Sequence, residues 1–138
     1  MRNDTKKARL ILERDGYTCV VCRDDSLYAA QERGVKPLLN WLDSGLDLAH
    51  FCAADKVVGR ATAFLYCLLG VEEVYAHVMS RPAARVLEEN GIAVEAKQLV
   101  DGIINRRGTG PCPFEAAVME IHDPTVALAA IRAKLSQM

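Results

Sequence analysis

The chain has 138 residues, 51% of them hydrophobic and 25% charged, a composition that fits one compact domain over residues 1–138. Its 17 basic and 18 acidic side chains nearly cancel, so the total charge favours neither nucleic acid nor an anionic membrane as a partner. With five scattered cysteines, no apolar run of the ~20 residues that a membrane span needs, and no apolar signal-peptide core, we expect a cytoplasmic protein with reduced thiols.

The first third of the chain predicts a surface helix, a β-hairpin and a second helix. Gly16 ends the surface helix, turn residues over 23–26 separate the two strands, and Pro37 suits the first turn of the second helix. The predicted elements are a helix over 5–14, strands over 17–22 and 27–32, and a helix over 37–42.

The most apolar stretch, residues 46–70, predicts a strand that runs directly into a buried helix. From Val57 to Leu69 nearly every residue is apolar, as expected for a helix in the interior of a layered fold. Asp55 and Lys56 stand at the expected start of this helix, beside its unpaired backbone amides. Open α/β sheets usually bind their ligands at such a place.

The rest of the chain alternates strands and helices. The predicted elements are a strand over 73–79, a helix over 80–91, a strand over 92–96, a short helix or extended segment over 99–106, a loop over 107–111, and helices over 112–120 and 123–138. This order predicts an α/β fold. We expect a three-layer α/β/α sandwich around a five-stranded mixed sheet, with parallel strands after the hairpin.

Four short segments resemble an uncharacterised prokaryotic family of small proteins. They are residues 54–60 (ADKVVGR), 74–76 (VYA), 105–106 (NR) and 112–115 (CPFE). The chain is similar in these segments to the domain-of-unknown-function family 1893, whose fold is cytidine-deaminase-like. The resemblance runs from about residue 17 to about residue 120, and it implies an architecture without naming an activity.

The resemblance also raises the question of a zinc centre. Zinc deaminases carry His-x-Glu on the helix after the hairpin and Pro-Cys-x-x-Cys on the helix after the third strand. Here these places fall at residues 33–36 and 52–55, which offer at most Cys52 and Asp55, whereas a catalytic zinc needs three protein ligands. The Pro-Cys-Pro at 111–113 comes one strand-helix unit too late. We therefore expect no zinc centre and no other cofactor.

Asp55 and Lys56 have two interpretations. In the structural one, Asp55 caps the buried helix and Lys56 is solvated. In the functional one, Lys56 and the amides of Val57 and Val58 hold an anion, and Gly59 permits the close approach of a ligand or another backbone. The predicted ligand-binding residues, all expected at the carboxyl edge of the sheet, are Lys36, Asp55, Lys56, Gly59, Ser80, Asn105 and Arg106.

Cys112 is the predicted nucleophile of a second hypothesis. It lies between two prolines at an expected helix start, where the helix dipole lowers a thiol pKa. Catalysis would combine Cys112 with Glu115 or Asp55 for proton transfer. The structural alternative is an inert thiol in a rigid turn, with Glu115 closing the helix cap.

Three functions follow from these patterns. The leading hypothesis is a deaminase-like domain without the zinc centre that binds a small anionic or nucleotide-like ligand at the carboxyl edge of the sheet. The first alternative is an enzyme of acyl or group transfer that uses Cys112. The second alternative is a non-catalytic structural or dimerisation domain, because uncovered strand edges favour a homo-oligomer.

Overall fold

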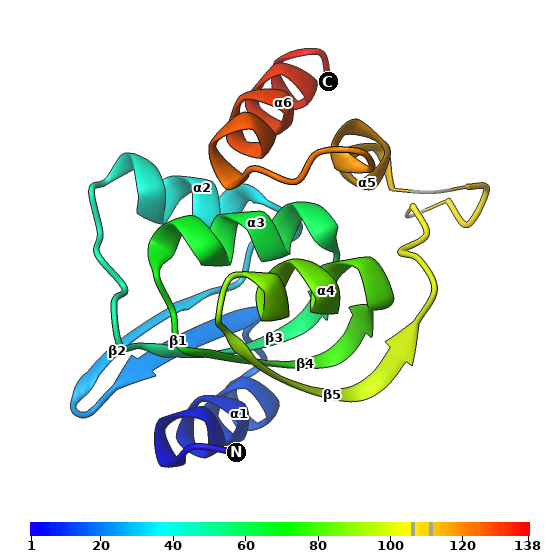
Figure 1. The fold of residues 1–138 in the computed structure, drawn as a ribbon. Coiled ribbons are helices and arrows are strands. Elements are labelled where there is room, and N and C mark those ends of the chain that lie inside the picture. The colour runs from blue at the N-terminus through cyan, green and yellow to red at the C-terminus, as the bar shows by residue number, and fades with distance from the viewer. Residues whose placement is uncertain (106, 111) are drawn as a thin grey trace.

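Five strands form one mixed sheet in the order β2-β1-β3-β4-β5, shown in Figure 1 for the computed structural model of the chain. The structure describes residues 1–105, 107–110 and 112–138. The strands are β1 (Cys19–Arg23), β2 (Ser26–Ala30), β3 (Cys52–Val58), β4 (Glu73–Ser80) and β5 (Ala93–Val100). β1 pairs antiparallel with both β2 and β3, while β3, β4 and β5 are parallel. The predicted mixed sheet is thereby confirmed.

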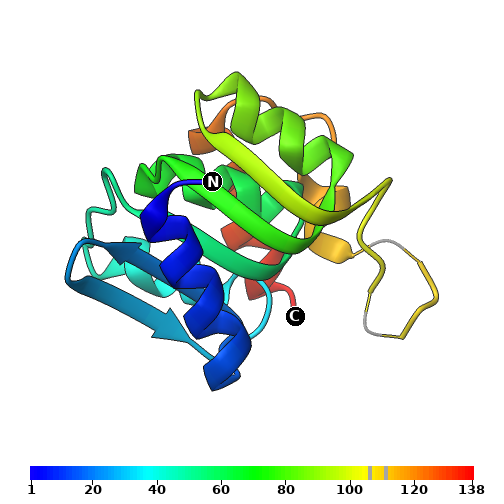
Figure 2. The same cartoon turned by 90° about the horizontal axis from the view of Figure 1, so that it is seen from below.

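Helices cover both faces of the sheet, as predicted. They are α1 (Asn3–Asp15), α2 (Lys36–Asp43), α3 (Arg60–Leu69), α4 (Arg81–Glu89), α5 (Pro113–Val118) and α6 (Pro124–Ser136). α1 packs on one face, and α2, α3 and α4 lie on the other (Figures 1 and 2). α5 and α6 lie outside this layer, over α3. Among the described residues, no helix is long and apolar enough to cross a membrane.

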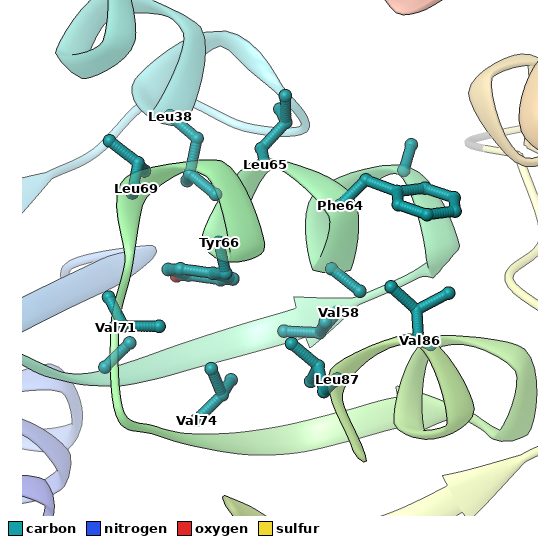
Figure 3. Packing of buried hydrophobic residues seen from close by; sticks show 14 of the residues in the cluster. Leu38, Val58, Phe64, Leu65, Tyr66, Leu69, Val71, Val74, Val86 and Leu87 are labelled. Atoms are coloured by element: carbon teal, nitrogen blue, oxygen red, sulfur yellow. The ribbon is translucent and has the colours of Figure 1, made fainter. Parts of the chain in front are cut away.

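The position of α3 between the sheet and α6 explains why its sequence is apolar on nearly every side. Phe64, Leu65 and Tyr66 are all fully buried. Figure 3 shows the Tyr66 ring directed from α3 toward the strand layer. On the outer side, α6 buries Ile131 against the same core. A helix enclosed by two layers has no face left for polar residues.

The predicted boundary between the third strand and the buried helix was wrong. β3 continues to Val58, and α3 begins at Arg60, after Gly59 in an extended conformation (φ −96°, ψ −179°). The two valines that end β3 pair with β4, and β-branched side chains favour the pleated strand over a helix start. Asp55 therefore does not cap α3, and Lys56 does not stand at a helix start.

Residues 99–106 were predicted to form either a short helix or an extended segment. The described residues, 99–105, form an extended segment. β5 reaches Val100, four residues beyond the predicted end at residue 96, and pairs with β4 along its length. No helix forms over 101–105. The strand extends because β4 offers partners as far as Ser80, which lies opposite Val100.

Candidate functional site

The carboxyl end of β3 borders an open notch in the sheet. β3 pairs with β1 only as far as Asp55, which lies opposite Cys19, and the Lys56 amide then donates to the Thr18 carbonyl at 3.0 Å. Among the described residues, no strand pairs with β3 on that side beyond this point, and Val57 is 46% exposed. The chain after β2 and the start of α2 close the notch into a pocket.

This pocket, which we call the Asp55 pocket, has a volume of about 380 Å³. It is lined by Gly16, Thr18 and Cys19, by residues 31–34, by Pro37 and by residues 55–57. Arg33 and Gly34 come from residues 33–36 and Asp55 comes from residues 52–55, the two places that the family resemblance compared with the halves of a deaminase site, and all three line this one cavity. Long-range strand pairing brings them together.

Asp55 lies at the inner end of this pocket and is only 8% exposed. Its Oδ2 accepts a hydrogen bond from the Tyr66 hydroxyl at 2.6 Å, and its Oδ1 accepts one from the Val57 amide at 3.2 Å. Burial raises the pKa of Asp55 to about 7, and the Tyr66 hydroxyl together with the backbone amides of Val57 and Lys56 limits the rise. The carboxyl can therefore give or take a proton near neutral pH.

The two ionisable groups nearest Asp55 stay protonated near neutral pH. Burial raises the pKa of the Cys19 thiol, directly opposite on β1, well above its usual range. Burial and the nearby carboxylate likewise raise the pKa of the Tyr66 hydroxyl. Of these three buried groups, only Asp55 exchanges a proton under ordinary conditions.

Two cationic side chains line the pocket together with Glu32, and a third cation follows close by in the sequence. Arg33 and Lys56 line it, and Lys36 precedes the lining residue Pro37; all three cations are exposed. Among the residues that the structure describes, none of them has a carboxylate within 4 Å. These charges are therefore free to meet an anion.

The start of α3, where the sequence predicted an anion, already holds a carboxylate of the chain itself. Glu115 accepts hydrogen bonds from the backbone amides of Arg60 at 2.8 Å and Ala61 at 3.2 Å. The predicted amides of Val57 and Val58 belong to β3 instead. Negative charge at a helix start is stabilised by the unpaired amides and the helix dipole.

Gly59 permits this contact. A Cβ atom at Gly59 would lie 2.2 Å from Glu115 Oε1, closer than real contacts allow, and 3.1 Å from Ile103 Cγ1, which is a tight contact. The sequence predicted that a ligand or another backbone would approach Gly59 closely. In the structure, the Glu115 side chain occupies that position.

Arg60 completes a reciprocal connection between α3 and α5. Its side chain is buried, donates from Nε to the Val118 carbonyl at 3.0 Å and from Nη2 to the Ile121 carbonyl, and lies over the Phe64 ring. A carboxylate of α5 thus caps the start of α3, while a cation of α3 caps the end of α5.

The other predicted site residues lie apart from the Asp55 pocket. The buried Ser80 hydroxyl caps α4 by accepting from the Ala83 amide at 3.1 Å, and the Asn105 side chain bonds to Thr109 across a turn. Arg106 lies outside the described residues. Cys112 is half-buried at the start of the six-residue helix α5 and does not line the pocket.

The two possible metal ligands predicted from the sequence do not converge. Cys52 lies opposite Cys22, which packs under α1, whereas Asp55 faces Tyr66 on α3. Three residues apart on a strand, they point to opposite faces. In the part of the chain that the structure describes, no three His, Cys, Asp or Glu side chains are grouped as metal ligands.

Tyr66 and Arg60 were missed as site residues by the sequence analysis. Both are polar groups in a helix that is apolar nearly all round, and a buried hydroxyl or guanidinium in such a helix needs a partner. That pattern was a usable signal, although it could not name Asp55 or the carbonyls of α5 as the partners.

A family model described as "TM1506: Domain of unknown function (DUF1893)" matches residues 7–135. The chain belongs to the DUF1893 family. A crystal structure of a DUF1893 family protein (TM1506) from Thermotoga maritima, at 2.70 Å resolution, superposes on this DUF1893 protein with a TM-score of 0.85 and 24% sequence identity, covering 100% of this chain and 92% of the other. That likeness shows a shared fold. No curated protein sequence matches this DUF1893 chain.

Proposed function

We propose that this DUF1893 protein is a deaminase-like domain without a zinc centre that binds a small anionic, nucleotide-like ligand in the Asp55 pocket. The observation that carries the proposal is the arrangement of charge. The exposed Arg33 and Lys56 line the pocket beside Glu32, without a carboxylate within 4 Å among the described residues, Lys36 directly precedes the lining residue Pro37, and the buried carboxyl of Asp55 lines the same pocket.

The size and polarity of the pocket support a ligand of this kind. Small-molecule sites are concave, commonly about 300–1,000 Å³, with a few polar groups that set orientation. At about 380 Å³ the Asp55 pocket is at the small end of that range. A phosphate or carboxylate at the mouth would neutralise exposed cations, and the rest of the ligand would reach Asp55.

The alternatives have weaker structural support. Cys112 would be the nucleophile of an acyl or group transfer, yet it lies outside the Asp55 pocket, and both oxygens of Glu115 accept hydrogen bonds from α3. A dimerisation domain remains a separate prediction, since β2 and β5 each pair with one neighbouring strand among the described residues.

The test is ligand binding measured by thermal shift and calorimetry with inorganic phosphate and a panel of nucleoside monophosphates. We expect saturable stabilisation by at least one of them, weakening as salt is added. Arg33→Ala and Lys56→Ala should each weaken binding roughly fivefold, about 1 kcal/mol, the upper value for a solvent-exposed ion pair.

Lys97→Ala provides the matched control, because Lys97 is an exposed cation on β5, two strands away from β3. It should leave the affinity unchanged. Absence of saturable binding by every compound, or equal losses in all three variants, would contradict the proposed function.

A further inference from the structure

We propose that the inner end of the ligand carries two neighbouring N–H donors, the pattern of an amidinium, a guanidinium or a 2-amino-6-oxopurine such as guanine, and that the ionised Asp55 accepts both. This inference rests on the proposed function, because it concerns the same pocket. It names the chemical class of the group that reaches the buried carboxyl.

The hydrogen bonds of Asp55 leave a matched pair of acceptor positions. An ionised carboxylate offers about four lone-pair sites, two on each oxygen. Tyr66 occupies one site on Oδ2 and the Val57 amide occupies one on Oδ1, so one site remains on each oxygen. The Lys56 amide donates its hydrogen bond to the Thr18 carbonyl at 3.0 Å, although it also lies close enough to the Asp55 carboxylate to lower the pKa of that group. Two parallel N–H donors fit such a carboxylate edge in the bidentate geometry seen with guanidinium groups.

Among the residues that the structure describes, none places a cation within 4 Å of the Asp55 carboxylate. It faces the Cys19 thiol from β1 and the Tyr66 hydroxyl from α3, with Glu32 and Arg33 on the chain before α2 and Lys56 next to it on β3. Arg33 and Lys56 are exposed, and neither lies within 4 Å of the carboxylate. A buried acceptor without enough donors is unfavourable, so a ligand that donates two hydrogen bonds gains affinity there.

The protonation state of Asp55 gives the inference a pH dependence. Because burial raises its pKa to about 7, the free protein at pH 6 holds a proton on most Asp55 carboxyls. That proton turns one acceptor into a donor that faces the donors of the ligand. Binding must therefore displace it, and affinity should rise with pH up to about 7 and then level off.

The test compares three nucleotides that share a purine ring and a phosphate. GMP presents two adjacent N–H donors, IMP lacks the amino group and presents one, and AMP presents a donor beside an acceptor. At pH 8 we expect GMP to bind wild-type protein at least roughly tenfold more tightly than IMP or AMP, the value of one hydrogen bond to a charged acceptor.

Asp55→Asn is the decisive variant. The asparagine side chain can still accept from the Val57 amide through Oδ1 and donate from Nδ2 to the Tyr66 hydroxyl oxygen, and a thermal melt would verify folding. In this variant the preference for GMP over IMP and AMP should fall below roughly threefold, because hydrogen bonds to a neutral acceptor are weaker than those to a charged one. GMP binding should also weaken less from pH 8 to pH 6 in this variant than in wild type. The weakening that is left should come from protonation of the GMP phosphate.

The outcomes separate the two proposals. Equal affinities of GMP and IMP for wild type, or a preference that survives Asp55→Asn, would overturn this inference while leaving a Lys56-dependent anion site in place. A lack of binding by all three nucleotides and by inorganic phosphate would overturn the proposed function together with the inference.

Discussion

At the scale of single residues, Asp55 is the side chain on which the pocket depends. A carboxyl that is 8% exposed loses most of its hydration, and Tyr66 and the Val57 amide replace only part of it. The folded protein therefore holds the proton of Asp55 more tightly than the unfolded chain. Keeping such a carboxyl buried therefore lowers the free energy of unfolding near neutral pH.

The stability of Asp55→Asn tests this cost directly. The pKa of Asp55 rises on folding from 3.8 to about 7. Between these values the folded state binds more protons, so the free energy of unfolding of wild type falls as pH rises. Relative to Asp55→Asn, the free energy of unfolding of wild type should fall by about 3 kcal/mol between pH 5 and pH 8. The slope should be about 1.4 kcal/mol per pH unit up to pH 7. Urea denaturation at both pH values measures it, and parallel changes in the two proteins would contradict the assignment.

At the scale of secondary-structure elements, α3 and α5 cap each other. Glu115 of α5 binds the first amides of α3, and Arg60 of α3 binds the last carbonyls of α5. Because α5 has only six residues, it would be marginal as an isolated helix. The reciprocal contacts therefore connect the C-terminal part of the chain to the sheet-bearing part.

Substitution of Gly59 tests this connection. A methyl group at Gly59 would displace the Glu115 carboxylate, which sits 2.2 Å from the position of the added Cβ. Gly59→Ala should lower the free energy of unfolding by about 1.5–3 kcal/mol, the usual range for hydrogen bonds to a charged group. Chemical denaturation measures the change. Gly102→Ala is the matched control, since a Cβ there meets nothing within 4 Å.

A double-mutant cycle shows whether the loss runs through Glu115. Glu115→Ala should cost a similar amount, and adding Gly59→Ala to it should cost little more, because the displaced carboxylate is already gone. Strictly additive effects would mean that the strain at Gly59 arises elsewhere, for example against Ile103 Cγ1 at 3.1 Å.

At the scale of the whole molecule, α6 is a cover over the central helix layer. Ala127 and Ile131 are its buried residues, and Arg132 pairs with Asp43 of α2 at 2.6 Å. Without α6, the outer side of α3 would present apolar side chains to water. We therefore expect the C-terminal helix to contribute directly to the stability of the core beneath it.

Ile131→Ala tests the contribution of this cover. Ile131 is fully buried, so its truncation should lower the free energy of unfolding by about 2–5 kcal/mol through lost burial and a residual cavity. Val126→Ala on the same helix, where the side chain is 54% exposed, should change it by less than about 0.5 kcal/mol. Guanidinium denaturation of both variants provides the comparison. Similar small losses in the two would show that α6 does not support the core.

By itself, the sequence determined the order of the elements and most of their limits. Gly16 ends α1 in a left-handed conformation, Pro37 lies in the first turn of α2, and Asp123 caps α6 by accepting from the Thr125 and Val126 amides. Such signals act between residues a few positions apart, so local chemistry is enough to specify them.

Only the tertiary structure decided where β3 ends and what each polar group meets. Val57 and Val58 favour a strand as β-branched residues, but they also open a long apolar run that fits a buried helix, and the pairing with β4 decides between the two. Tyr66 meets Asp55 because α3 packs on the sheet, and Glu115 reaches the amide of Arg60 across 55 residues of chain. Partners so distant in sequence are selected by the packing of layers, which leaves no periodic pattern along the chain.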